Sequence, residues 1–234
     1  MFVLSIPSVF EARLRYNGIY FDASDIEIKE TIIVRSQQEF LELPDKLASY
    51  DKPALVSIIL ITDIDLEGRP FQLLSSPKEV YGIVKGNWHT INNMDASGSN
   101  GGFFAYAKHW IISELKFVNP TVRADHDGGI IAGYMDSCIV SDISIDNPTL
   151  EVQQSCGAVA GVAVDSRIRN VRVIISTEPK GGIGGLVVGS AKQNTIVEDV
   201  HVRVLPTVDW GAFGSSASTY NDMPVARRFV KEYI

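Results

Sequence analysis

The sequence GIIAG at residues 129–133, followed by VSDISI at 140–145 and NPT at 147–149, decides the fold because all three motifs recur along the chain. The first motif recurs as GFFAY at 102–106, GAVAG at 157–161 and GLVVG at 185–189. The second recurs as ISELKF at 112–117, IRNVRV at 168–173 and VEDVHV at 197–202. The third recurs as NPT at 119–121, and more weakly around Thr177 and as LPT at 205–207. The constant order and the spacing of 27 to 29 residues identify a tandem repeat.

Each repeat contains short runs in which apolar and polar side chains alternate, a pattern typical of β-strands. One such unit cannot bury its apolar side alone, whereas stacked units form a continuous core. We therefore expect an all-β fold in which coils of about 27–29 residues stack into a parallel β-solenoid. In the second motif, Ile112, Leu115 and Phe117 and their equivalents are expected to point into the core.

One position of the second motif falls between inward-pointing residues. It is occupied by Glu114, Asp142, Asn170 and Asp199. The chain must bend there, and Asn and Asp tolerate the left-handed backbone conformation that such a bend requires. Because successive coils lie about 4.8 Å apart, equivalent residues should form ladders along the solenoid.

The chain is expected to divide into a capping segment at residues 1–53, a solenoid at 54–208 and a C-terminal cap or helix at 209–234. Ser36 and Glu39 form a capping-box pattern that predicts a short helix, which Pro44 should shorten or kink. Pro224 favours the start of a second short helix near the C-terminus. The apolar residues that would share a face of this second helix are Val225, Phe229, Val230 and Ile234.

The charge and the hydrophobic runs of the chain exclude several classes of protein. The 234 residues carry 21 Lys and Arg against 28 Asp and Glu, and the net charge of −7 opposes sequence-independent binding to nucleic acid. The longest uncharged runs, residues 53–62 and 152–164, are too short to span a membrane. Met1 to Phe10 lacks the basic region and the cleavage site of a signal peptide. We therefore expect an intracellular, phage-particle or non-Sec-exported protein without membrane insertion.

Beyond the repeat itself, a family resemblance is visible. The order LITDIDL at 60–66, VKGNWHTINNM at 84–94, GFFA at 102–105 and then the repeated glycine motifs resembles bacterial proteins with GLUG-type repeats. These belong to the right-handed parallel β-helix, or pectate-lyase-like, group. The resemblance covers residues 54–204 and implies a right-handed, three-faced β-helix of the kind often found in surface, secreted or adhesive proteins. It implies little about activity.

Candidate catalytic residues are few. A polysaccharide hydrolase needs two carboxylates about 5 to 9.5 Å apart, and the bend ladder offers Glu114, Asp142 and Asp199, interrupted by Asn170. The bend already accounts for these residue types, so we expect no catalytic residues. Nucleophile-elbow, P-loop and zinc-type motifs are absent from the sequence.

We also expect no metal and no cofactor. The turn at Asp125, His126 and Asp127 has metal-ligand residue types, but it is expected to be solvated. Cys138 and Cys156 occupy different phases of the repeat and are expected to be buried, inert thiols.

The outward-pointing residues of the second motif are candidates for ligand binding. Two ladders are expected on one face of the solenoid, one with Ser113, Ser141, Arg169 and Glu198, the other with Lys116, Ser144, Arg172 and His201. The simple interpretation is cross-strand pairing, for example of Arg169 with Glu198. The other is a docking surface formed by Lys116, Arg169, Arg172 and His201, with arginine suited to carboxylates. Trp88, Trp110 and Trp210 could stack on sugars, although we expect Trp88 and Trp110 to be partly buried.

These observations favour a non-catalytic recognition or scaffold module that binds a protein or an acidic glycan through flat solenoid faces. Two alternatives remain open: a carbohydrate-active enzyme of the pectate-lyase-like group, and an acidic intracellular or phage-encoded inhibitor of a basic partner. Homo-oligomers could form through a solenoid face or the C-terminal helix.

Overall fold

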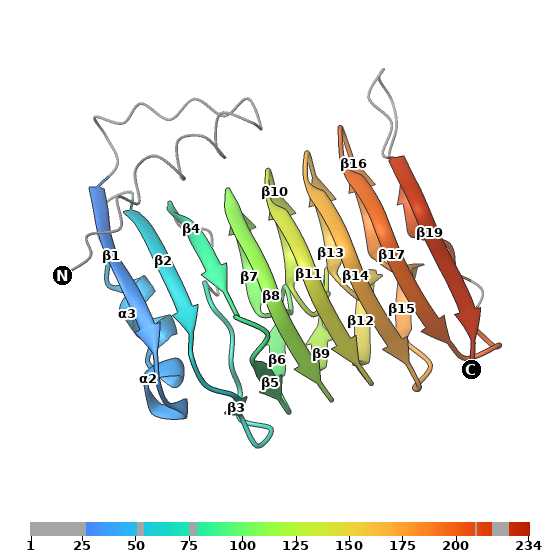
Figure 1. Ribbon diagram of the computed structural model, residues 1–234. Coiled ribbons are helices and arrows are strands. Elements are labelled where there is room, and N and C mark those ends of the chain that lie inside the picture. Colours follow the sequence, from blue (N-terminus) through green and yellow to red (C-terminus); the bar gives the residue numbers. More distant parts are fainter. Residues whose placement is uncertain (1–26, 51–53, 75–78, 209, 217–224) are drawn as a thin grey trace.

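The computed structural model is a parallel β-solenoid of about 7 turns. It describes residues 27–50, 54–74, 79–208, 210–216 and 225–234. Figure 1 shows the broadest sheet, sheet A, in front, with its strands side by side along the length of the molecule. The sequence-based expectations for residues 1–26 and for Asp222 to Pro224 concern residues outside the described ranges.

Three parallel sheets form the walls of the solenoid. Sheet A contains, in spatial order, β1 (Glu27–Val34), β2 (Ala54–Leu60), β4 (Val80–Lys85), β8 (Trp110–Val118), β11 (Ile139–Asp146), β14 (Arg167–Ile175), β17 (Ile196–Val204) and β19 (Val225–Tyr233), with β3 (Ile64–Asp65) and β5 (Thr90–Asn92) beside them. Sheet B contains β6 (Asp95–Gly98), β9 (Thr121–Ala124), β12 (Thr149–Gly157) and β15 (Lys180–Gly185). Sheet C contains β7 (Phe104–Lys108), β10 (Ala132–Asp136), β13 (Ala160–Val164), β16 (Val188–Lys192) and β18 (Phe213–Ser216).

The strand register follows the sequence repeat. Ile143 of β11 lies opposite Leu115 of β8 on one side and Val171 of β14 on the other, and Val171 lies opposite Val200 of β17. All four side chains are buried in one continuous apolar core. The predicted solenoid and its inward-pointing residues are therefore confirmed.

The predicted bend is present in each of these four strands. Glu114, Asp142, Asn170 and Asp199 have φ angles of 57°, 60°, 50° and 54°. A left-handed residue interrupts the alternation of inward and outward side chains along the strand. Apolar residues before and after the bend can therefore both point into the core. This explains why polar residues, mostly Asp and Asn, recur where a regular strand would place an ordinary β residue.

Two short helices lie beside the N-terminal strands (Figure 1). Helix α2 (Gln37–Leu41) begins at Ser36, whose hydroxyl accepts the backbone N–H of Glu39, as the capping-box pattern predicts. Helix α3 (Leu43–Ala48) carries Pro44 in its first turn. The Phe40 ring of α2 stacks on Phe71 at 4.4 Å, which closes this end of the core. No helix in the described ranges is both long enough and apolar enough to cross a membrane.

The prediction of a C-terminal helix is wrong. Residues Val225–Tyr233 form strand β19, which pairs in parallel with β17 along its whole length. The outer edge of β17 offers a row of backbone donors and acceptors, and satisfying them outweighs a weak helical pattern. At the other end, β1 pairs with β2 and is the first strand of sheet A.

Candidate functional site

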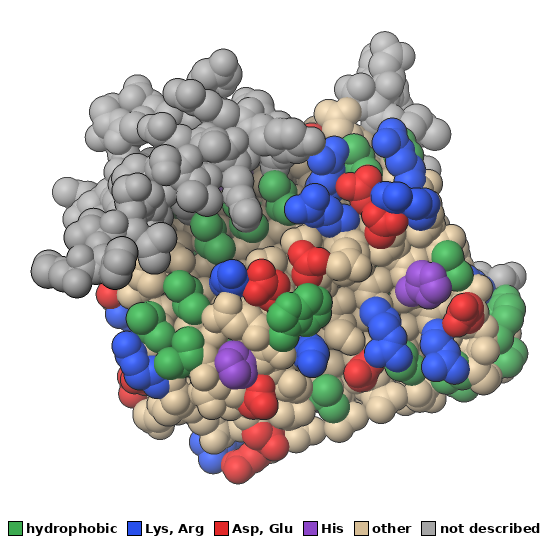
Figure 2. Space-filling model, in the orientation of Figure 1, with side chains coloured by type: hydrophobic (Ala, Val, Ile, Leu, Met, Phe, Trp, Pro, Cys, Tyr) green, Lys and Arg blue, Asp and Glu red, His purple; other side chains and the backbone are tan. Residues whose placement is uncertain are grey.

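The solvent face of sheet A contains the predicted cationic residues. The register places Lys116, Ser144, Arg172 and His201 at equivalent positions of β8, β11, β14 and β17. Arg169 lies at the other outward position, between Ser141 and Glu198. Lys116, Arg169, Arg172 and His201 are all exposed. Figure 2 shows positive and negative side chains intermingled over the C-terminal half of this face.

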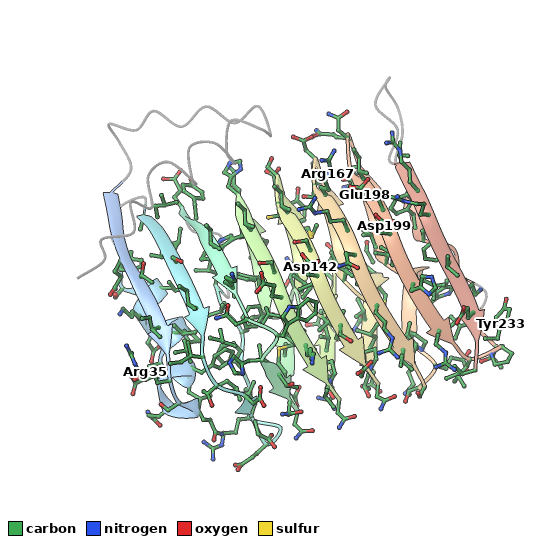
Figure 3. All side chains as sticks on the ribbon, in the orientation of Figure 1. Arg35, Asp142, Arg167, Glu198, Asp199 and Tyr233 are labelled. Carbon is green, nitrogen blue, oxygen red and sulfur yellow. The ribbon has the colours of Figure 1, made fainter. Side chains whose placement is uncertain are left out.

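The ion pairs on this face differ from the simplest expectation. Glu198 lies 4.0 Å from Arg167, not from Arg169, and Figure 3 shows Arg167 beside Glu198. Arg172 lies 3.8 Å from Asp146. Within the described part of the chain, neither Arg169 nor Lys116 has a carboxylate within 4.0 Å. Neither cation is therefore held in an ion pair with the described residues, although Lys116 acts on Asp63 from a longer distance and helps to lower its pKa.

The carboxylates of the bend ladder are engaged between coils. Glu114 lies 3.5 Å from the Lys85 ammonium. Asp142 accepts a hydrogen bond from the Asn170 side-chain amide, and Asp199 pairs with Arg228 of β19. Figure 3 shows Asp142 and Asp199 on the solvent face of sheet A. These contacts give the carboxylates a role in coil stacking, and Asn170 links two coils through its amide.

The side chains of the turn with metal-ligand residue types form hydrogen bonds with residues of neighbouring coils. Asp125 accepts from the Gln153 amide at 3.3 Å, and Asp127 accepts from the Ser155 backbone N–H at 3.3 Å. The His126 ring lies 2.9 Å from the Ser99 hydroxyl. In the ranges that the structure describes, no three His, Cys, Asp or Glu side chains converge as metal ligands would.

Sheet B carries a depression that sequence reasoning did not single out. It is open, has a volume of about 780 Å³ and is lined by Arg123, Glu151, Gln153 and Lys180 among others. Arg123 donates to both oxygens of Asp95, at 2.9 and 3.0 Å, and also lies 3.4 Å from Glu151. A hydrogen bond from Lys180 lowers the pKa of Glu151. The sequence does contain an indication of this depression, because Arg123, Glu151 and Lys180 occupy one equivalent position of successive repeats. Their charges neutralise one another across the coils.

A second feature that the sequence did not reveal is the turn that carries Trp88. Trp88 is 48% exposed, so about half of it is buried, but it lies in a turn and not in the expected strand-like run, whereas Trp110 is fully buried. Lys85 pairs with Ser113, and Thr90 pairs with Lys116. Four residues therefore separate the two paired positions on this coil, whereas two residues separate them on the next coil. The inserted residues form a tight turn instead of a simple bend.

The turn has an uncommon backbone conformation. His89 N–H donates to the Gly86 carbonyl at 2.9 Å, and the two central residues, Asn87 and Trp88, have φ angles of 48° and 64°. This is the pattern of a type I′ turn, in which the second central position favours glycine. A left-handed conformation costs a side-chain-bearing residue about 1–2 kcal/mol, and a bulky residue such as Trp88 adopts it rarely.

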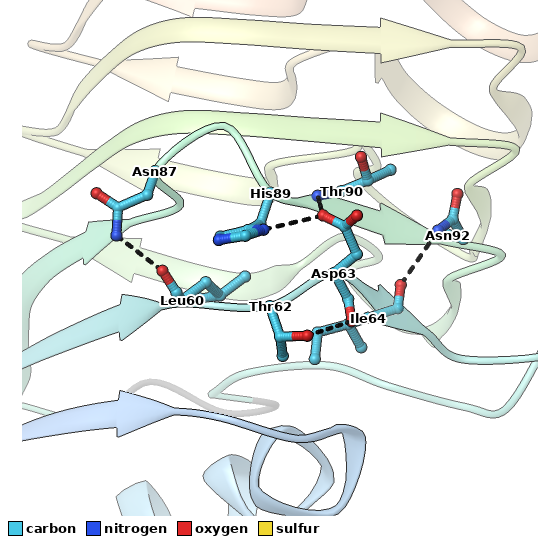
Figure 4. Close-up of polar contacts among 8 residues, drawn as sticks. All are labelled: Leu60, Thr62, Asp63, Ile64, Asn87, His89, Thr90 and Asn92. Atoms are coloured by element: carbon cyan, nitrogen blue, oxygen red, sulfur yellow. Dashed lines mark hydrogen bonds and ion pairs between the residues drawn. The ribbon is translucent and has the colours of Figure 1, made fainter.

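Polar contacts fix this turn from both sides, and Figure 4 shows those with the preceding coil. The Asn87 amide donates to the Leu60 carbonyl at 2.7 Å, and the His89 ring lies 3.0 Å from Asp63. The Thr90 backbone N–H donates to Asp63 at 2.8 Å, and together with the His89 contact it holds the pKa of Asp63 below its usual range. Trp88 N–H donates to the Glu114 carbonyl at 2.7 Å. The position of Trp88 on sheet A is therefore determined by its neighbours.

Fold and surface together define a repeat protein of the β-solenoid class with an open, charged sheet face. No family model matches this chain, no similar curated protein was found, and no solved structure matches it. The resemblance to GLUG-type repeat proteins rests on the sequence motifs described above.

Both cysteines are buried and unpaired, as predicted. Burial raises the pKa of each thiol to about 12, so at neutral pH neither is a thiolate. We expect iodoacetamide to label neither Cys138 nor Cys156 in the native protein at pH 7.5, and both in guanidinium, as measured by mass spectrometry. Rapid labelling of either thiol without denaturant would contradict the described packing.

Proposed function

We propose that the protein is a non-catalytic recognition module that binds an acidic partner on the solvent face of sheet A. The observation that supports this most directly is that Lys116 and Arg169 lie in no ion pair with the described residues, beside a bend ladder whose carboxylates already have partners. Arginine and lysine on a rigid sheet suit ligand carboxylates, and the guanidinium group can bind them in a bidentate manner. Arg172 and His201 extend the column that begins at Lys116.

The shape of the surface supports recognition over catalysis. The cations lie on an open sheet face, which suits an extended partner better than enclosure of a small substrate. The acidic side chains at the bend are engaged by neighbours on adjacent coils, Glu114 and Asp199 by cations and Asp142 by the Asn170 amide. A hydrolase requires a pair of carboxylates facing the substrate. This interpretation applies to a glycan and to an acidic protein segment alike.

We expect Arg169→Glu to weaken binding to immobilised polygalacturonate and polyglutamate by about tenfold at low salt, because loss of one cation is compounded by repulsion. Binding of the unaltered protein should also weaken as salt increases. Biolayer interferometry would give both dissociation constants. The matched control is Lys108→Glu, which makes the same charge change on an exposed residue at the end of β7 in sheet C.

Three results would count against the proposal. They are absence of binding to both polymers, equal losses for Arg169→Glu and Lys108→Glu, and shortening of polygalacturonate chains during incubation. If shortening were seen and Glu114→Gln abolished it, the enzyme alternative would replace the recognition module.

A further inference from the structure

We propose that Trp88 is the stacking platform of a sugar subsite, and that it binds a pyranose unit of a carboxylate-bearing polysaccharide whose charge is met by Lys116. This inference rests on the proposed function and specifies its ligand class. It starts from an unfavourable choice of residue for stability: a tryptophan at the turn position where glycine fits best, with about half of its surface exposed.

Core packing does not account for this choice of residue. The left-handed residues in the described strands of sheet A are polar, and most are short, as at Asp142 and Asn170, although Glu114 and Arg228 are long. Trp88 occupies the same region of the sheet, yet it is 48% exposed. A bulky residue held in an unfavourable conformation by its surroundings points to a functional role for its side chain.

The platform is preorganised. Gly86 packs so closely on Glu114 and Leu115 that a Cβ atom would clash with both, which fixes the first residue of the turn. The amide of Asn87 and the ring of His89 tie the turn to the preceding coil at Leu60 and Asp63 (Figure 4). An indole that is already in position loses little conformational freedom when a ligand binds.

The size of the apolar surface favours a sugar ring over a protein. The coil that precedes Trp88 contributes one large exposed apolar residue, Ile61. It follows Leu60, whose carbonyl accepts the hydrogen bond from Asn87. Two exposed side chains are far fewer than the roughly 20–30 residues that each partner contributes to a stable protein interface. The C–H face of a pyranose can pack on an indole, and aromatic surface with a few polar groups is typical of small-ligand sites.

The surrounding groups match a carboxylate-bearing sugar. Lys116 lies opposite Thr90, two residues after Trp88. It is near enough to Asp63 to help lower the pKa of that carboxyl, but no carboxylate of the described residues lies within 4.0 Å of its ammonium group. Its column continues through Ser144 to Arg172, two coils and therefore about 10 Å further along the solenoid. A polysaccharide lying along the solenoid axis would meet an aromatic ring, a cation, a hydroxyl and a second cation in order.

The test compares Trp88→Gly with the unaltered protein. We expect the substitution to raise the melting temperature by about 2–4 °C, because glycine relieves the left-handed strain. At the same time, we expect affinity for polygalacturonate to fall at least tenfold, with affinity for polyglutamate changed less than twofold. Trp88→Asn, which keeps a residue suited to a left-handed backbone, should lose sugar binding in the same way and serves if the glycine variant does not fold.

The outcomes separate this inference from the proposed function. If the unaltered protein binds polygalacturonate and Arg169→Glu weakens it while both Trp88 variants bind normally, the sugar platform is refuted and the recognition module stands. If both Trp88 variants lose polyglutamate as strongly as polygalacturonate, the site is not a sugar subsite. If the unaltered protein binds neither polymer, both proposals fail.

Discussion

Ile143→Asp is expected to leave the chain unfolded at 25 °C. Ile143 is 2% exposed and lies between Leu115 and Val171 of the neighbouring coils. A buried carboxylate without a partner costs several kcal/mol or is protonated at a similar cost, while a domain has only about 5–15 kcal/mol of stability in total. Far-ultraviolet circular dichroism and a urea titration would show the loss. Val171→Asp should behave in the same way.

The matched control is Ser144→Asp, one residue further along the same strand. Ser144 points outward between Lys116 and Arg172, so a carboxylate there meets two cations and remains in contact with water. We expect its stability to stay within about 0.5 kcal/mol of the unaltered protein. If the cooperative melt were unchanged by Ile143→Asp but lost in Ser144→Asp, Ser144 would be the residue in the core and the described register would be wrong.

Gly157→Ala is expected to have the second-largest effect. A Cβ atom at Gly157 would clash with the Ala160 carbonyl and would lie 2.7 Å from backbone atoms of both Val187 and Gly189 in the next coil. These are main-chain atoms that cannot rotate away, so the coils must separate locally. Overpacking costs about 1–3 kcal/mol and occasionally more. We expect the upper end of this range here, measured as a lower urea midpoint.

Gly211→Ala provides the comparison for this prediction. Its nearest atom to a new Cβ would be the Phe213 carbonyl oxygen at 3.7 Å, an ordinary contact, and the residue is exposed. Restricting the unfolded chain should make this variant neutral or more stable by up to about 1 kcal/mol. Equal midpoints for Gly157→Ala and Gly211→Ala would show that the close approach of coils at Gly157 is not maintained in solution.

These two predictions concern the solenoid, and the binding predictions concern one of its faces. The link is the parallel register, because a stack in which Leu115, Ile143 and Val171 share one inward column necessarily places Lys116, Ser144 and Arg172 in one outward column. Core packing therefore sets the spacing of any ligand-binding groups on sheet A, and a variant that shifts the register should lose both stability and binding.

Much of the fold could be predicted from the residues alone. The period of the glycine motifs determines the coil length, and the apolar positions of the second motif determine which side chains enter the core. The bend at Asp142 and its equivalents, and the helix that begins at Ser36, follow from local backbone preferences. The cationic residues of sheet A were also found this way, since a regular repeat places equivalent residues in register.

The rest depended on neighbours that a local pattern does not encode. Val225–Tyr233 becomes a strand because the edge of β17 is available for pairing. Glu198 pairs with Arg167, two residues away along the neighbouring strand, although Arg169 lies directly opposite it. Trp88 is exposed because two inserted residues change a bend into a turn, which is braced by residues of the preceding coil. The sequence by itself thus determined the repeat, its core and its outward ladders, since every coil repeats the same environment; only the tertiary structure decided the terminal strand, the ion pairs and the aromatic platform, because each depends on contacts made once between particular coils.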